Sequence, residues 1–163
     1  MMIIRFFAGC CGVAIATLWL TLPARAQFSQ FPGSPIFENA SLSLGFAPDP
    51  TVLRGISGGE QPAREVAARV ETPTGPCSGF VDGLPDHVLT LTDFFDYLDL
   101  QVYSPEDTTL VVRGPGGTWC NDDIVERNPG IAGQWLPGRY EIWVGSYRQH
   151  DYHPYIIRLS QVR

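Results

Sequence analysis

Five runs in the second half of the chain combine β-branched, aromatic and leucine residues in the patterns that strands show. In the run 97–103, Leu98, Leu100 and Val102 share one face, so we expect this strand to be buried on one side and wet on the other. Turns rich in Gly, Pro, Asn and Asp separate the runs. The five predicted strands are 87–92, 97–103, 109–113, 140–144 and 155–159.

The region before these runs has a weaker pattern. Residues 41–46 alternate polar with apolar side chains and predict a first strand, whereas prolines and glycines in 47–59 predict a loop. Residues 61–70 have helical composition, although their end could equally form a strand before Pro73. Short strands, frequent turns and few helical spacers favour an all-β fold, an antiparallel jelly-roll-like β-sandwich, over an α/β sheet.

The N-terminus has the pattern of a secretory signal peptide. Arg5 precedes an apolar run over 6–22, and Ala24 and Ala26 form an A-x-A processing signal. We therefore expect cleavage before Gln27. A retained membrane anchor is the alternative, because the run is near the lower limit of a membrane span. Lipoprotein processing at Cys10 is less favoured, since most of the apolar run follows that cysteine.

Cleavage defines the expected organisation of the chain. The signal peptide covers residues 1–26, a lead-in segment with the first strand covers 27–60, and the β-sandwich covers 61–163. The composition, with 44% hydrophobic and 17% charged residues, suits a globular domain and is too apolar for a disordered chain. We expect a periplasmic or extracellular protein with no stable membrane insertion after cleavage.

Export changes both the charge and the cysteine count. The 137 mature residues would hold nine Arg and seventeen acidic residues, a net charge of −8, which argues against nucleic acid as a partner. Of the four cysteines, Cys10 and Cys11 leave with the signal peptide. Cys77 and Cys120 remain, and in an oxidising compartment they predict one disulfide. A metal site at these two cysteines is the alternative, but neither lies in a CxxC or Cys/His cluster.

Two acidic turns are the candidate metal site. Asp107 ends one turn, and Asn121, Asp122 and Asp123 lie in another. Oxygen ligands of this kind suit Ca²⁺, so we name these four residues as candidate calcium ligands. The alternative is that they hold their turns by hydrogen bonds to backbone N–H groups, without metal.

The same turns carry a resemblance to a known family. The segments 107–112, 121–123 and 137–140, followed by Trp143 and Val144, resemble the bacterial pre-peptidase C-terminal domain. The resemblance spans roughly 86–160 and implies a non-catalytic β-sandwich module of secreted enzymes, with a calcium requirement in some members. One departure is that Thr109 stands where many members carry an aspartate.

Three further motifs contain candidate catalytic, zinc-binding or ligand-binding residues. Ser57 lies in a Gly-x-Ser-Gly-Gly sequence like that of trypsin-like proteases, but no mature histidine precedes it, so we expect a plain turn. His150 and His153 lack an evident third zinc ligand and are predicted to lie on a surface loop. Among the mature tryptophans, Trp135 is predicted to be exposed and to bind a ligand such as a carbohydrate.

These observations predict an exported, non-catalytic β-sandwich module with a binding or structural role, which calcium would stabilise, and with an unknown protein or glycan partner. The alternatives are a carbohydrate-binding protein and, less favoured, a small secreted hydrolase.

Overall fold

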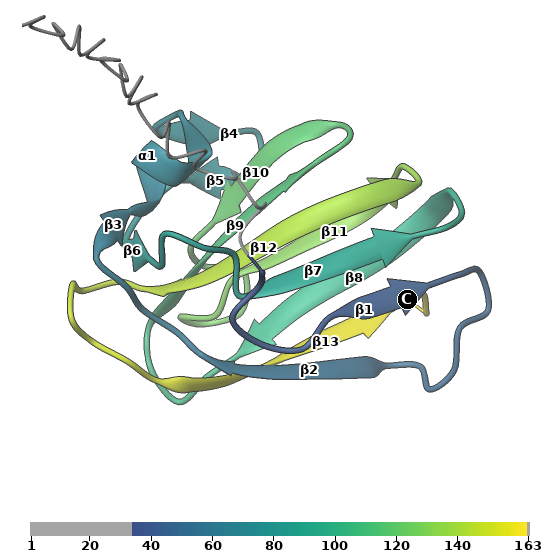
Figure 1. Ribbon diagram of the computed structural model, residues 1–163, viewed down its shortest axis with the longest axis horizontal. Helices are drawn as coiled ribbons and strands as arrows, with labels where there is room; N and C mark the ends of the chain where they lie inside the picture. Colours follow the sequence, from purple (N-terminus) through teal and green to yellow (C-terminus); the bar gives the residue numbers. More distant parts are fainter. Residues whose placement is uncertain (1–33, 163) are drawn as a thin grey trace, which may run out of the picture. The chain divides into compact units, whose positions relative to one another are not determined.

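The computed structural model describes residues 34–162, and the predicted signal peptide and its cleavage point lie outside this range. Two β-sheets pack face to face, so the prediction of an all-β sandwich is confirmed (Figure 1). One sheet contains β1 (Ala40–Leu42), β3 (Gln61–Pro62), β6 (Phe80–Val81), β7 (His87–Leu91), β9 (Thr108–Gly114), β10 (Gly117–Asn121) and β12 (Gly138–Ser146). The other, in the order β11-β8-β13-β2, contains β2 (Thr51–Ile56), β8 (Phe95–Tyr103), β11 (Gly130–Trp135) and β13 (Pro154–Ser160).

The larger sheet is covered on both faces because its central strands are apolar on both sides. In β9, Leu110 and Val112 belong to the main core between the sheets, whereas Val111 points to a second apolar cluster. In β12, Val144 and Trp143 divide in the same way. Continuous apolar runs are typical of strands buried on both faces, as β9 and β12 are here.

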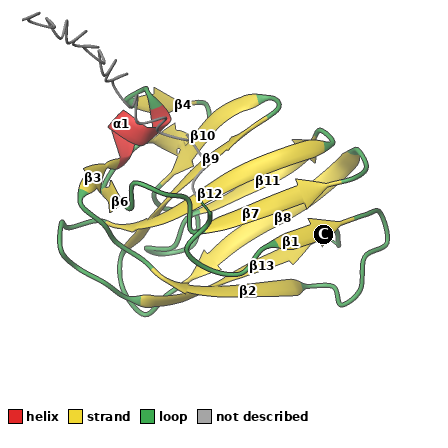
Figure 2. Cartoon of the chain, in the orientation of Figure 1, coloured by secondary structure: helices red, strands yellow, loops and turns green. Residues whose placement is uncertain are grey.

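The second cluster lies beneath a small cover layer. Helix α1 (Ala63–Ala67) and the hairpin of β4 (Glu71–Thr72) and β5 (Gly75–Pro76) form this layer, and α1 is the only helix drawn in the described chain (Figure 2). Ala63 and Ala67 of α1 are buried and belong to the second cluster. Among residues 34–162, no helix has the length and apolar character needed to cross a bilayer.

The five predicted strands are present as β7, β8, β9, β12 and β13. The prediction of a loop over 47–59 is wrong, because β2 forms at Thr51–Ile56 and pairs with β13. A first strand is present at Ala40–Leu42, so the predicted strand 41–46 is correct only at its start, and it pairs with β7 in parallel rather than antiparallel. β1 and β2 both belong to the sheets of the sandwich, so the structure has no domain boundary near residue 60. Residues 61–70 contain β3 and the short helix α1, and β4 follows before Pro73.

Candidate functional site

The candidate site lies where the edges of the two sheets meet. In the described chain β10 pairs only with β9, and β11 pairs only with β8, so each is an edge strand. The two strands are consecutive in the sequence and contact one another across the sandwich. We call this side of the molecule the seam. One half of it is closed by hydrogen bonds, and the other half is open.

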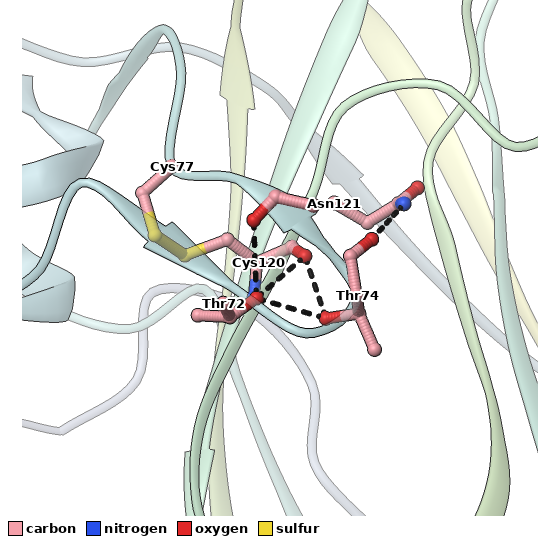
Figure 3. The surroundings of a disulfide bond; sticks show 6 residues. Thr72, Thr74, Cys77, Cys120 and Asn121 are labelled. Atoms are coloured by element: carbon pink, nitrogen blue, oxygen red, sulfur yellow. Dashed lines mark hydrogen bonds between the residues drawn. A yellow bond between two sulfur atoms is a disulfide. The ribbon is translucent and has the colours of Figure 1, made fainter.

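The closed half is covered by the β4–β5 hairpin, as Figure 3 shows. The backbone N–H of Cys120 in β10 donates to Oγ1 of Thr72 at 3.0 Å. The carbonyl of Cys120 accepts from the hydroxyls of Thr72 and Thr74, at 3.2 and 2.7 Å. Two threonine side chains thus take the place of a neighbouring strand at this edge. The predicted disulfide between Cys77 and Cys120 is present and ties β5 to the same position.

Asn121 completes the closed half by joining three segments. Its Nδ2 donates to the carbonyl of Thr74 at 2.7 Å, and its Oδ1 accepts from the backbone N–H of Gly130 at 2.9 Å. One side chain therefore links β10, the β4–β5 turn and β11. Both atoms of the Asn121 amide are therefore engaged in hydrogen bonds within the protein.

The open half contains a pocket of about 290 Å³. Its inner wall is formed by three aromatic rings, with centroids 6.5 Å apart for Trp119 and Trp135 and 5.0 Å apart for Trp135 and Tyr140. Phe94 and Leu136 stand at the surface beside it, 42% and 47% exposed. Figure 1 shows the turns after β7, β9 and β11 at the same end of the molecule, and residues of all three line the pocket.

The lining of this pocket is uncharged, and two of its polar side chains, Tyr140 and Trp135, donate their hydrogen bonds to backbone carbonyls. None of the described residues that line it is Asp, Glu, Lys, Arg or His. The Tyr140 hydroxyl donates to the carbonyl of Leu136 at 2.8 Å, and burial raises its pKa. The indole N–H of Trp135 donates to the carbonyl of Leu98 at 3.0 Å. The pocket is therefore suited to a largely uncharged group, and its volume exceeds that of a cavity of about 150 Å³ that holds one benzene ring.

The burial of Trp135 differs from what the sequence predicts. The sequence predicts an exposed ring, but the side chain is only 4% exposed. It belongs to the main core because it is the last residue of β11 and points between the sheets, where Leu98 accepts its N–H. Trp119 on β10 is half-buried and is the more accessible indole of the pair. Trp135 still lines the pocket as part of its inner wall.

The three predicted carboxylate ligands influence one another electrostatically. Burial, followed by the charges of Asp123 and Asp107, raises the pKa of Asp122 to about 6. Burial and the charge of Asp123 also raise the pKa of Asp107. Oδ1 of Asp122 is buried without a hydrogen-bond partner in the described structure. No three carboxylate, imidazole or thiol groups within residues 34–162 are placed to hold one metal ion.

A second, polar pocket of about 170 Å³ includes Asp107 and lies among the turns at the other end of the strands. Its charged side chains have both signs. Arg127 and Arg148 stand beside the acidic residues and offset part of the rise in the pKa of Asp107. These charges compensate one another, so this pocket favours neither a cation nor an anion. Its lining residues are Glu106, Asp107, Arg127, Tyr147, Arg148, Asp151 and His153.

The candidate nucleophile Ser57 is buried and has no imidazole as its partner. Its Oγ lies 2.8 Å from Oγ of Ser146, and it accepts from the backbone N–H of His153 at 3.3 Å. The ring of His87 is occupied elsewhere, 2.8 Å from the hydroxyl of Tyr155. Among the described residues, the arrangement at Ser57 resembles an internal hydrogen-bonded pair of hydroxyls rather than a nucleophile and its base.

Sequence reasoning missed most of the seam. Thr72 and Thr74 lie in a short hairpin without strand periodicity, and Tyr140 is recognisable only as a strand residue. Phe94 and Leu136 gave a usable signal, because each is a large apolar residue within a turn. Such residues are buried only if the turn folds back, and otherwise they mark a binding surface.

No protein-family model matches this chain. Over 86 residues it is 34% identical to an uncharacterized protein of Synechococcus elongatus, a match that covers 50% of this chain and 63% of that protein. The chain thus spans less than two thirds of the length of this relative. The structure is similar to the pre-peptidase C-terminal domain of collagenase from Bacillus anthracis, with a TM-score of 0.45 and 14% identity over 78% of this chain and 99% of that chain. That domain is a solved example of the family that the sequence motifs resemble.

Proposed function

We propose that the protein is an exported, non-catalytic β-sandwich module that binds a protein or glycan partner through the pocket at the open half of the seam. The observation that supports this most strongly is the aromatic wall of Trp119, Trp135 and Tyr140 behind an opening flanked by exposed apolar residues. Aromatic residues supply much of the binding energy at protein interfaces, and loops on a rigid sandwich are a common place for such sites.

The non-catalytic part of the proposal is supported by Ser57. Its hydroxyl is paired with Ser146 inside the protein, where a substrate would need the fold to open. A serine-reactive fluorophosphonate probe should leave the folded protein unlabelled. Labelling that is lost in Ser57→Ala would contradict a non-catalytic role and favour the hydrolase alternative.

Export is supported by the signal-peptide pattern of residues 1–26 and by the disulfide between Cys77 and Cys120. Disulfides persist in oxidising compartments and are rare in reducing ones. Expression of the full chain in a Gram-negative host tests this: the protein should appear in the periplasm or medium, shortened by 26 residues at its N-terminus. A full-length product that stays with the membrane would favour the anchor alternative.

The binding role is tested with one variant in the pocket and one exposed control outside it. Wild-type protein, Trp119→Ala and the exposed control Tyr152→Ala are compared on a glycan array and on an immobilised peptide library, after circular dichroism has verified that each is folded. Binding that is lost in Trp119→Ala and kept in Tyr152→Ala supports the proposal. Binding that survives in Trp119→Ala would place the site elsewhere, and the absence of any ligand in both formats would contradict the proposal.

Stabilisation by calcium stays a prediction from the sequence. The repulsion among Asp107, Asp122 and Asp123 speaks for it, because a cation would relieve it. The engaged amide of Asn121 speaks against it. The melting temperature in millimolar calcium, in magnesium and in chelator decides the question. A rise that is specific to calcium is expected if the turns bind it, and equal values would exclude a calcium site.

A further inference from the structure

We propose that the open half of the seam binds an extended peptide segment of a partner protein, which pairs with the outer edge of β11 and places one uncharged apolar side chain in the aromatic pocket. This inference rests on the proposed function, since it takes the pocket to be the binding site. It adds the class of partner and the geometry of recognition. Strand addition beside a side-chain pocket is a known way for a β-protein to bind a peptide.

The first argument is the direction in which β11 presents its backbone. Val102 of β8 donates to the carbonyl of Pro129 at 3.0 Å, and Ile131 pairs with Leu100 two residues further on. Because hydrogen-bonded and outward positions alternate in antiparallel pairs, Gly130 and Ala132 direct their N–H and C=O groups away from β8. The bond from Gly130 to Asn121 confirms this direction. Ala132 is exposed and lines the pocket.

The second argument is that the chain already closes the other half of this seam in a related way. Outward backbone groups of Cys120 and Gly130 are paired there with Thr72, Thr74 and Asn121. The next outward position along β11, Ala132, lies at the open half, beside the pocket. An extended peptide would do for Ala132 what the β4–β5 hairpin and Asn121 do for the closed half.

The third argument is space. Gly133 has φ +147°, and a Cβ placed on it would meet no atom within 4 Å. The same is true of Gly117 in the neighbouring β9–β10 hairpin, with φ +134°. The β-bulge between Gly133 and Trp135 interrupts the regular edge. We therefore expect pairing over a short stretch around Ala132, with the side-chain pocket supplying the rest of the affinity.

The lining of the pocket favours a peptide side chain over a buried sugar. A sugar ring carries several hydroxyls, and each one that is buried without a partner costs about 1 to 3 kcal/mol. The hydroxyls of Thr74 and Tyr140 already donate to the carbonyls of Cys120 and Leu136. This leaves the Gln134 amide and the Trp119 indole N–H as the main polar groups for a ligand, fewer than the hydroxyls of a buried sugar ring. An aromatic or aliphatic side chain needs no such partners, and the peptide backbone would be satisfied by the edge of β11.

The experiment begins with a phage library of random 12-residue peptides, selected on the wild-type protein. The enriched peptides are then made synthetically, and their Kd values are measured by fluorescence polarisation. Leu136→Ala should weaken binding about tenfold or more. Leu84→Ala is the matched control, because Leu84 is also 47% exposed but does not line the pocket. Its Kd should equal that of the wild type.

The decisive measurement is a scan of the best peptide by N-methylation, which removes one backbone donor at a time. Loss of binding at alternate positions, together with loss when the apolar anchor residue is changed to Ser, would support strand addition at β11. Tight binding without this alternation would overturn it. Glycans that bind in a Trp119-dependent way, with no peptide selected, would also overturn it while leaving the proposed function intact. Ligands that bind independently of Trp119 and Leu136 would overturn both.

Discussion

The two halves of the seam begin from the same kind of structure and end differently. In both, the edge strands β10 and β11 face each other at the margin of the core. In the closed half, threonine hydroxyls and the Asn121 amide satisfy the backbone edge, and a disulfide holds the covering hairpin in place. In the open half, aromatic rings line an accessible pocket instead. The comparison teaches that a strand edge can be closed by side chains alone, and that the half left open is the one available for recognition.

Among the variants that test this comparison, removal of the disulfide should lower the free energy of unfolding the most. The double variant Cys77→Ala/Cys120→Ala opens a loop of 43 residues in sequence separation and should lose about 2 to 4 kcal/mol of unfolding free energy in urea titrations. Adding reductant to the wild type should reproduce much of the loss, and adding it to the double variant should change nothing. An unchanged midpoint in the double variant would mean that the hairpin is held by its hydrogen bonds alone.

The next largest loss of unfolding free energy is expected for Asn121→Ala. It leaves the buried N–H of Gly130 without a partner, which should cost about 1 to 3 kcal/mol. Amide hydrogen exchange at Gly130 should accelerate. Asn39→Ala is the control, because Asn39 likewise accepts from a backbone N–H, that of Val88, but lies outside the seam. If exchange at Gly130 were the same in both variants, Asn121 would not hold the closed half together.

Asp122→Asn should change stability in the opposite direction. The folded-state pKa of Asp122 is about 6, above the ordinary aspartate value of 3.8, so the wild type loses stability as the pH rises from about 4 to about 6. The variant should therefore unfold at a higher temperature than the wild type at pH 7, and the difference should vanish below pH 4. Asp123→Asn, which only removes repulsion, should give a smaller gain. A variant that is less stable at pH 7 would show that the hydrogen bond between Asp122 and Ser78 outweighs burial and the repulsion.

Leu136→Ala and Phe94→Ala should have the smallest effect on stability. Both side chains are largely exposed at the open half, so each should cost about 0.5 kcal/mol or less in thermal or urea unfolding. Combined with the loss of ligand binding, this would separate the open half from the closed half. A loss of 2 kcal/mol or more would mean that these residues belong to the core rather than to a binding surface.

The parts of the fold that could be predicted are those with a local pattern. The five strand runs alternate or are continuously apolar, and only two cysteines remain after the signal peptide is set aside, so both could be identified from the sequence. The strand β2 could not, because prolines precede it and Gly55 interrupts it. Gly55 is explained by the three-dimensional fold, since a Cβ there would meet the Tyr155 hydroxyl at 2.3 Å.

The candidate site was harder to predict because it depends on contacts distant in sequence. The lining of the pocket comes from several turns, and no local period brings Phe94, Trp119 and Leu136 together. Asn121 was predicted as a ligand because an acidic neighbourhood is visible in the sequence. The hydrogen-bond partners of its side chain, Thr74 and Gly130, are 47 and 9 positions away and could not be identified from that neighbourhood. Trp135 was expected to be exposed because its neighbours are turn-like, whereas strand alternation turns its ring inward.

The pair of indoles in the open half also provides an optical reporter. Trp119 and Trp135 lie with their ring centroids 6.5 Å apart and their ring planes 30° apart, close enough for their strong far-ultraviolet transitions to couple and to give an exciton signal in circular dichroism. Trp143 lies in the other apolar cluster, with the Arg113 guanidinium 4.9 Å from its ring centroid. Its fluorescence should respond to changes beneath the hairpin. Occupancy of the pocket and opening of the cover layer can therefore be followed separately in the unlabelled protein.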